Sequence, residues 1–347
     1  MIDLLDLPAS RRHFATMRTQ DLFTSSDWLS VIADTYGIAV HAVLDRADDA
    51  TLPLAVMDDL AGRRLIGLPF SDYMLLPYGI DTAISLAERA LARYPDFAIA
   101  MRIALNQPIS TMRGQWDIRP SAVYHRLRID SEAALWRGLS QSFRNQVRQG
   151  WRHGVTAQLT RSEEARERFI SMHTSLRNRK FLSLAQPRDF LHLIYDRLMA
   201  SGPGFFIESL RGSDVVASCL VLAHADVLYY KFSASTPDAA EVRGNNVMLW
   251  ELLRTAAASG QFKTIDFGRS GLGEGYAGLR HFKESLGASA HPIAEISHPA
   301  RRPDGQAAKH AAEFLALAKE TSKLIASAGN SQELNDAAAR IFYRYFA

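Results

Sequence analysis

Hydrophobic and polar positions in the first part of the chain alternate between the helical and the strand period. Apolar residues from Trp28 to Tyr36 recur at helical spacing, and Gly37 follows them as a stop signal. The runs "IAVHAVLD" and "LPLAVMDD" are typical of strands, and the polar "RADDAT" between them predicts a hairpin. Strands are also expected at "RRLIGLPF", "FAIAMRIAL" and "SAVYHRLRI", and Asp81 is expected to cap a helix between the first two. The pattern predicts a mixed α+β domain over residues 1–130.

The next segment, "SEAALWRGLSQSFRNQVRQGWRHG", is almost wholly helical in pattern. It places an apolar stripe beside a basic stripe at the same i, i+4, i+8 spacing. The apolar stripe consists of Phe143, Val147 and Trp151, and the basic stripe of Arg144, Arg148 and Arg152.

The remainder is strand-rich and then helical. "FFIESL", "VVASCLVLA" and "VLYYKFSAS" predict an antiparallel meander. A helix, "NNVMLWELLRTAAAS", ends at Gly260 and is followed by the strand "FKTIDFG", a short helix and the strand "HPIAEIS". We therefore expect a second domain over residues 131–300 and a helical tail over residues 301–347.

Composition is that of an ordinary soluble globular protein, with 47% hydrophobic and 22% charged residues. No apolar run approaches the roughly 20 residues of a membrane helix, and the start carries acids where a signal peptide needs a basic region. The single cysteine, Cys219, is expected in the core and fits a reducing cytoplasm. Net charge is only +3, but residues 137–180 hold ten basic residues against three acids. This asymmetry indicates a local site for an anionic partner.

The most conspicuous motif is G-x-G-x-x-G at Gly273, Gly275 and Gly278. A dinucleotide site needs these glycines directly at a strand-to-helix turn, early in an alternating βαβ series. Here the helix after them is short, and only one further strand follows. We therefore interpret the match as a coincidence within a glycine-rich loop. Zinc signatures are also absent from the sequence, so no metal site is expected.

A more informative unit is the start of the helix after "VLYYKFSAS". The polar loop "TPDAAEVRG" delivers Arg243, Gly244, Asn245 and Asn246 to this helix start. Unsatisfied backbone N–H groups and the helix dipole favour an anion such as phosphate there, and an ordinary capped helix is the alternative.

Residues 229–287 resemble the C-terminal half of the FemAB-like, BioF2-type GNAT acyltransferases. The recurring pattern is an aromatic strand, an Arg-x-x-Asn helix start, "DFG-R", and then "Y…FK…G". Upstream, "SFRNQVRQGWRHGV", "SSDWL" and "LPFSDY" are also similar to segments of this family, so the resemblance spans most of the chain. The matching positions are Tyr229–Lys231, Arg243, Asn246, Trp250, Gly260, Asp266–Arg269, Tyr276, Phe282, Lys283 and Gly287.

The resemblance implies two tandem GNAT-like α+β domains with mixed, largely antiparallel sheets. It also implies transfer of an acyl group from acyl-CoA or aminoacyl-tRNA to an amine. Two departures stand out. The GNAT pyrophosphate signature is not intact in "RGNNVM", and the long coiled-coil insertion of the peptidoglycan-bridge enzymes is missing, which counts against tRNA.

The site residues follow from the resemblance together with the chemistry of each side chain. Lys283 is expected to stabilise the oxyanion, Asp266 to orient or deprotonate the amine, and Tyr276 to donate a proton. The donor is expected to bind Arg243, Gly244, Asn245, Asn246, Tyr230 and Lys231. The acceptor or other anionic groups are expected to bind Arg269, Ser270, Tyr229, Arg144 and Arg148.

The leading hypothesis is a cytoplasmic N-acyltransferase that uses direct transfer from acyl-CoA to a small-molecule or peptide amine, without a metal or DNA. One alternative is an aminoacyl-tRNA-dependent transferase that acts on a peptidoglycan precursor or small peptide; the basic helix favours it. Another is a non-catalytic accessory protein of exopolysaccharide synthesis, which the imperfect pyrophosphate signature favours.

Overall fold

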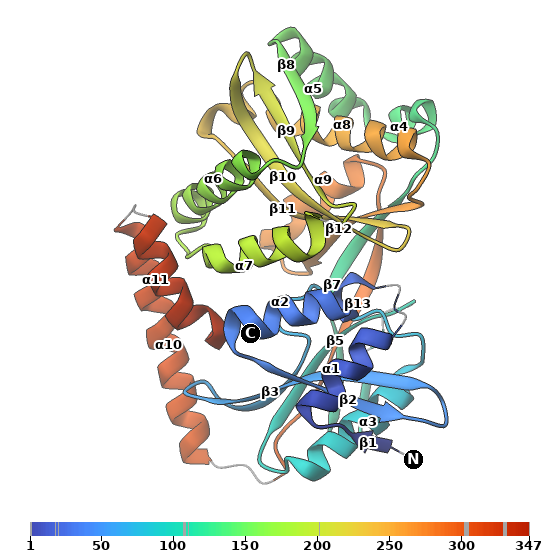
Figure 1. Ribbon diagram of the computed structural model, residues 1–347, viewed down its shortest axis with the longest axis vertical. Helices are drawn as coiled ribbons and strands as arrows, with labels where there is room; N and C mark the ends of the chain where they lie inside the picture. The colour runs from blue at the N-terminus through green and yellow to red at the C-terminus, as the bar shows by residue number, and fades with distance from the viewer. Residues whose placement is uncertain are drawn as a thin grey trace. The chain divides into compact units, whose positions relative to one another are not determined.

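The computed structural model describes residues 2–17, 19, 21–106, 109, 111–200, 202–301, 305–328 and 332–346. The chain forms two compact units that are discontinuous in sequence (Figure 1). Unit 1 comprises Met1–Ala122, Pro292–Lys323 and Ala338–Ala347, and unit 2 comprises Val123–His291 and Leu324–Ala337.

Unit 1 is built on a mostly antiparallel sheet. Its neighbouring strands run in the order β1-β2-β3-β4-β5-β13, and only β4 and β5 are parallel. The strands are β1 (Ile2–Leu4), β2 (Ala39–Asp45), β3 (Ala50–Asp59), β4 (Gly62–Gly67), β5 (Ala98–Ala104), β6 (Thr111–Arg113) and the first part of β7 (Trp116–Arg128), with most of β13 (Ser289–His298). The helices are α1 (Leu7–Thr16), α2 (Ser26–Tyr36), α3 (Ile80–Arg93), most of α10 (Gly305–Ser327) and the end of α11 (Gln332–Phe342).

Unit 2 holds the predicted meander. Strands β8, β9, β10 and β11 are antiparallel neighbours, and β11 pairs in parallel with β12. The strands are β8 (Val155–Thr160), β9 (Phe205–Arg211), β10 (Asp214–His224), β11 (Val227–Ser235) and β12 (Thr264–Gly271), with the end of β7. The helices are α4 (Glu132–Gly138), α5 (Gln141–Arg152), α6 (Glu163–Phe181), α7 (Arg188–Ile194), α8 (Gly244–Ser259) and α9 (Ala277–Ser285), and a π-helical turn at Tyr195–Met199 continues α7.

Helices cover both faces of the unit 2 sheet (Figure 1). Alternation along β9 turns Phe205 and Ile207 into the core beneath α8, whereas Phe206 packs against Phe169 of α6 on the other face. Cys219 is fully buried in the α8-side core, as predicted. Both units are mixed α/β with largely antiparallel sheets, which confirms the expected α+β fold class.

Local chemistry explains where the structure departs from the sequence pattern. The segment after Asp130 is two helices, because the hydroxyl of Ser140 accepts a hydrogen bond from the Phe143 N–H and starts α5 anew. Asp81 lies in the first turn of α3, whose N-cap is Gly79, so the prediction of an Asp81 cap was wrong.

The expected domains over residues 1–130, 131–300 and 301–347 stay a prediction, beside compact units that are discontinuous in sequence. Strands β7 and β13 each contribute residues to both units, and the C-terminal helices are divided between them. No helix within the described ranges is long and apolar enough to cross a membrane.

Candidate active site

The start of α8 is shaped by close packing. Arg243 precedes the helix in the left-handed conformation, with φ of 63°, which non-glycine residues rarely adopt. Gly244 is buried, and a Cβ atom there would lie 2.8 Å from Cγ2 of Val216. Glycine is therefore required at this position by its neighbours in the fold.

The polar side chains at this helix start contact α5. Arg243 Nε donates to Gln149 Oε1 at 3.0 Å, and Asn246 Nδ2 donates to Gln146 Oε1 at 2.9 Å. Asn245 is half-buried. The side chains of Arg243 and Asn246, predicted to hold the donor, thus hold α5 against α8, and the first-turn backbone N–H groups are the remaining anion-binding feature of this helix start.

Lys283 of α9 is a buried cation beside the end of β12. Its side chain is 5% exposed, and its ammonium group donates to Gly268 O at 2.9 Å, Arg269 O at 3.2 Å and Ser270 Oγ at 2.9 Å. Ser270 is 1% exposed. Because its oxygen accepts from a cation, the Ser270 hydroxyl directs its own proton elsewhere and becomes a stronger donor.

Asp266 of β12 is engaged on both carboxylate oxygens. Oδ1 accepts from the Gly268 N–H at 2.7 Å, and Oδ2 accepts from Arg126 Nε at 3.0 Å. Gly268 has φ of 71°, so the first bond fixes a left-handed turn within β12. Asp266 therefore shapes this strand and anchors Arg126, which the sequence analysis did not identify.

Two histidines also missed by sequence reasoning flank this region. His125 on β7 is fully buried, and burial, followed by the charge of Lys283, lowers its pKa to about 4. Neither ring nitrogen of His125 has a hydrogen-bond partner within the described ranges. His291 is half-buried and stacks on Tyr124 at 5.0 Å; burial, followed by Arg126, lowers its pKa. His291 is therefore a neutral imidazole at pH 7, beside the Arg126–Asp266 pair.

The aromatic and basic residues predicted as site residues on β11 and β12 differ in their burial. Tyr229 is buried, and Tyr230 packs against Phe267 at 5.8 Å, where β11 and β12 run side by side. Lys231 lies over the ring of Phe232, whereas Arg269 is exposed.

The glycine-rich loop is held in place, and its G-x-G-x-x-G pattern has no steric role. Arg280 donates to the carbonyl oxygens of Gly271 and Gly273, and the ring of Tyr276 fills the space that a side chain on Gly271 would need. Tyr276 is 51% exposed, so it is accessible to a ligand. A Cβ atom at each of the three motif glycines would meet nothing within 4 Å, and none has a positive φ. The motif does not form a dinucleotide turn.

The basic stripe of α5 is only partly available. Arg144 donates to the carbonyl oxygens of Trp136, Arg137 and Leu139, so it caps the end of α4. Arg148 is exposed and lies 5.3 Å from the centroid of the Trp136 ring.

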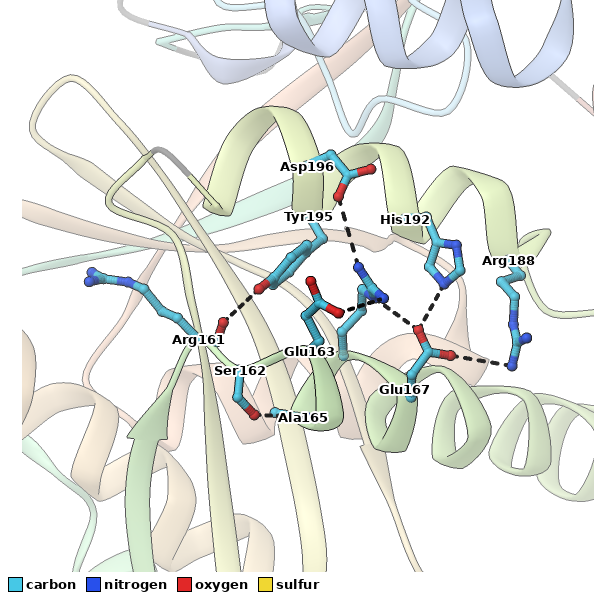
Figure 2. Close-up of polar contacts among 10 residues, drawn as sticks. Arg161, Ser162, Glu163, Ala165, Glu167, Arg188, His192, Tyr195 and Asp196 are labelled. Carbon is cyan, nitrogen blue, oxygen red and sulfur yellow. Dashed lines mark hydrogen bonds and ion pairs between the residues drawn. The ribbon is translucent and has the colours of Figure 1, made fainter.

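A further polar network joins α6 and α7, and Figure 2 shows its members. Glu167 accepts from Arg166 at 2.9 Å and from His192 at 3.0 Å, and it pairs with Arg188 at 3.4 Å. Burial raises the pKa of Glu167, but the hydrogen bonds from Arg166 and His192 outweigh it, and the net effect lowers that pKa. Tyr195 donates to the carbonyl oxygen of Arg161 at 2.7 Å. Arg166 of α6 also lies 3.9 Å from Asp196, so the network links α7 and the π-helical turn to α6.

In the part of the chain that the structure describes, no group of three or more His, Cys, Asp or Glu residues is placed to hold a metal ion.

Comparison with known proteins relates this site to a family. Residues 141–284 match the family described as "Acetyltransferase (GNAT) domain". The fold resembles FemX with a TM-score of 0.62 and 12% identity, over 87% of this chain and 98% of that one. It also resembles the C-terminal domain of a putative lysylphosphatidylglycerol synthetase from Agrobacterium fabrum, with a TM-score of 0.55 and 12% identity over 90% and 96% of the two chains. L-PGS from Bacillus licheniformis is similar with a TM-score of 0.53 and 11% identity, over 88% of this chain and 96% of that one. No curated protein sequence gives a significant match.

These findings confirm the resemblance drawn from the sequence. Residues 141–284, which lie inside unit 2, match the GNAT acetyltransferase domain family, and 87% of the chain has a fold similar to that of FemX.

Proposed function

We propose that the protein is an N-acyltransferase that moves an acyl group from acyl-CoA to an amine in one direct step. The observation that carries this proposal is the buried Lys283 ammonium bound to Ser270 Oγ, inside the segment that matches the GNAT family. A buried cation that polarises a hydroxyl is suited to stabilise the oxyanion of acyl transfer.

In the proposed step, the amine nitrogen attacks the thioester carbonyl carbon, and the carbonyl electrons move to oxygen. The Ser270 O–H donates to this oxygen, with Lys283 behind it. Collapse of the intermediate re-forms the carbonyl and breaks the C–S bond, and the departing sulfur takes up a proton. Tyr276 is exposed, and its phenol is the proposed donor of this proton.

The amine must lose a proton to become an amide. His291 suits this task better than Asp266, because His291 is neutral and Asp266 already accepts from Arg126 and Gly268. Arg126 and Asp266 are then positioning residues that set the surroundings of His291.

The donor anion is proposed to bind the backbone N–H groups at the start of α8. The close packing of Gly244 and the contacts of Arg243 and Asn246 with α5 preorganise this helix start. Tyr230 and Lys231 on β11 are proposed to contact the part of the donor that lies between its anionic group and its thioester. Arg269, which is exposed, is proposed to contact a charged group of the acceptor.

A second candidate is transfer from aminoacyl-tRNA. The fold similarity to FemX and to lysylphosphatidylglycerol synthetase supports it, since the latter name describes an aminoacylated lipid. The carbonyl chemistry at Ser270 and Lys283 is the same for an ester donor.

Thermal-shift and turnover measurements with acetyl-CoA and with aminoacyl-tRNA separate the two donors. We expect acetyl-CoA to raise the melting temperature and to release free thiol when an amine is present. Acyl transfer that needs aminoacyl-tRNA and is abolished by RNase would instead support the second candidate.

A further inference from the structure

Two tryptophans from neighbouring helices of unit 2 form a stack that reaches the surface. The rings of Trp136 on α4 and Trp151 on α5 lie 5.8 Å apart at an interplanar angle of 11°. Trp250 of α8 supports Trp136 from the interior, edge to face at 4.6 Å. Trp151 is 47% exposed, although its stripe-mates Phe143 and Val147 are buried. An exposed tryptophan on a rigid support leaves an aromatic face open to a planar ligand.

Positive charge surrounds this aromatic surface. Helix α5 carries Arg144, Arg148 and Arg152 and no acidic residue. Arg144 is used to cap α4, but Arg148 and Arg152 are exposed, and Arg148 lies against the Trp136 ring. We call Trp136, Trp151, Arg148 and Arg152 the tryptophan platform.

The tryptophan platform adjoins the start of α8. A Cβ atom on Gly150 would clash with Val247 and would lie 3.3 Å from Cβ of Arg243, so the residue before Trp151 packs directly on this helix start. Gln149 accepts from Arg243 at 3.0 Å. An anion bound at the first turn of α8 would therefore lie close to the end of α5.

We propose that the tryptophan platform binds the nucleotide of the acyl donor. The purine stacks on the outer face of Trp151, and its phosphate groups pair with Arg148 and Arg152. This inference rests on the proposed function for the identity of the donor. Coenzyme A and the 3′ end of tRNA both carry an adenosine nucleotide, so the same chemistry serves either donor.

A membrane surface fits the platform less well. Lipid binding by a helix requires a broad apolar face, and Trp151 is the one large hydrophobic residue of α4 and α5 that is exposed. One exposed aromatic ring beside two arginines is instead suited to bind a base and its phosphate groups.

The test compares Trp151→Ala and Arg148→Ala/Arg152→Ala with the wild-type chain. Adenosine 3′,5′-bisphosphate and a short RNA ending in CCA are the two nucleotide probes, with binding followed by calorimetry. We expect Trp151→Ala to weaken binding of the preferred probe about 5- to 100-fold, the range of base stacking on an aromatic residue. Trp151→Phe should restore part of it. The double arginine variant should weaken binding and flatten its salt dependence. Phe181→Ala, which removes another exposed aromatic side chain, is the matched control and should leave binding unchanged.

Donor truncation separates this inference from the proposed function. Trp151→Ala should raise KM for acetyl-CoA and leave KM for acetyl-phosphopantetheine, which lacks the nucleotide, unchanged. Equal KM for both donors in the wild type would overturn the platform while the transferase assignment stands. Trp151-dependent nucleotide binding without turnover of any donor would support the platform while the transferase assignment falls. Nucleotide binding by Trp151→Ala within twofold of wild type would overturn the platform. The platform would also be overturned if Trp151→Ala lost binding to phosphatidylglycerol vesicles and kept binding to both nucleotide probes.

Discussion

The ammonium nitrogen of Lys283 lies 2.9 Å from the hydroxyl oxygen of Ser270, and both side chains are almost fully buried. The backbone carbonyl groups of Gly268 and Arg269 also accept hydrogen bonds from this lysine. In the proposed function the lysine therefore acts on the substrate through Ser270. The role expected from the sequence, in which Lys283 stabilises the oxyanion, stays a prediction, and the proposal adds the Ser270 hydroxyl between the two.

Ser270→Ala tests the hydroxyl. If Ser270 donates to the oxyanion, its removal should lower kcat about 100-fold, the usual effect of losing one such donor. Lys283 keeps its two carbonyl partners, so the melting temperature should change little. Ser142→Ala, at an exposed serine of α5, is the control and should keep full turnover. A Ser270→Ala enzyme with near-normal kcat would exclude this role.

Breaking the buried ion pair should cost stability. Arg126→Met leaves Asp266, which is 1% exposed, without its cationic partner, and we expect a loss of about 3 kcal/mol in the free energy of unfolding. The exposed pair between Arg46 and Asp3 provides the comparison, and Arg46→Met should cost less than about 1 kcal/mol. Urea denaturation measures both. Similar losses in the two variants would show that burial does not strengthen the Arg126 pair.

Gly150 and Gly138 should respond oppositely to alanine. A Cβ atom on Gly150 would clash with Val247, whose branched side chain is stiff in a helix, and overpacking of this kind costs about 1–3 kcal/mol. A Cβ atom on Gly138 meets nothing within 4 Å. Gly138→Ala should therefore be neutral or slightly stabilising, whereas Gly150→Ala should unfold at lower denaturant and bind the donor more weakly. Equal stability of the two variants would contradict the packing described for α5 on α8.

Stability should fall in weak acid because of His173. This side chain is 4% exposed, and burial lowers its pKa to about 4. Between its ordinary value near 6.5 and about 4, the unfolded chain binds a proton that the folded chain does not, so stability is full above pH 6.5 and declines below it. The decline attributable to one such histidine is about 1–3 kcal/mol between pH 7 and pH 4. Denaturation at several pH values should show a shallower slope in His173→Phe, while His153→Phe, at an exposed histidine, should keep the wild-type slope.

The pH dependence of turnover tests His291. Burial, followed by the charge of Arg126, lowers the pKa of His291, so the rate should decline at a more acidic pH than an ordinary imidazole would give. His291→Gln should lower kcat/KM about 100-fold or more and abolish this decline. The same substitution at exposed His281 should change neither. A His291→Gln profile that retains the wild-type shape would assign the proton acceptor to another group.

Local signals in the sequence predicted much of unit 2. The meander of β9, β10 and β11 was expected from short apolar runs with polar breaks. These elements are set by alternation and turn chemistry, which a sequence displays directly.

Relationships between distant residues were not predictable in the same way. Arg126 and Asp266 are 140 positions apart, and nothing local to either residue indicates the other. The contact of Gln149 with Arg243 and the stack of Trp136 on Trp151 likewise depend on how α4, α5 and α8 pack. The family resemblance directed attention to Lys283, but only the fold revealed that its ammonium group faces Ser270 and two carbonyl groups.

The most direct test of the proposed function is amine-dependent release of free thiol from acetyl-CoA, with a panel of amines, by the wild-type protein and Lys283→Met. Lys263→Met, at an exposed lysine, serves as the control, and circular dichroism verifies folding. We predict thiol release that requires both protein and amine, is at least 100-fold slower in Lys283→Met, and is unchanged in Lys263→Met. No amine-dependent loss of acyl groups from acetyl-CoA or aminoacyl-tRNA, or a folded Lys283→Met protein within a few-fold of wild type, would contradict the proposed function.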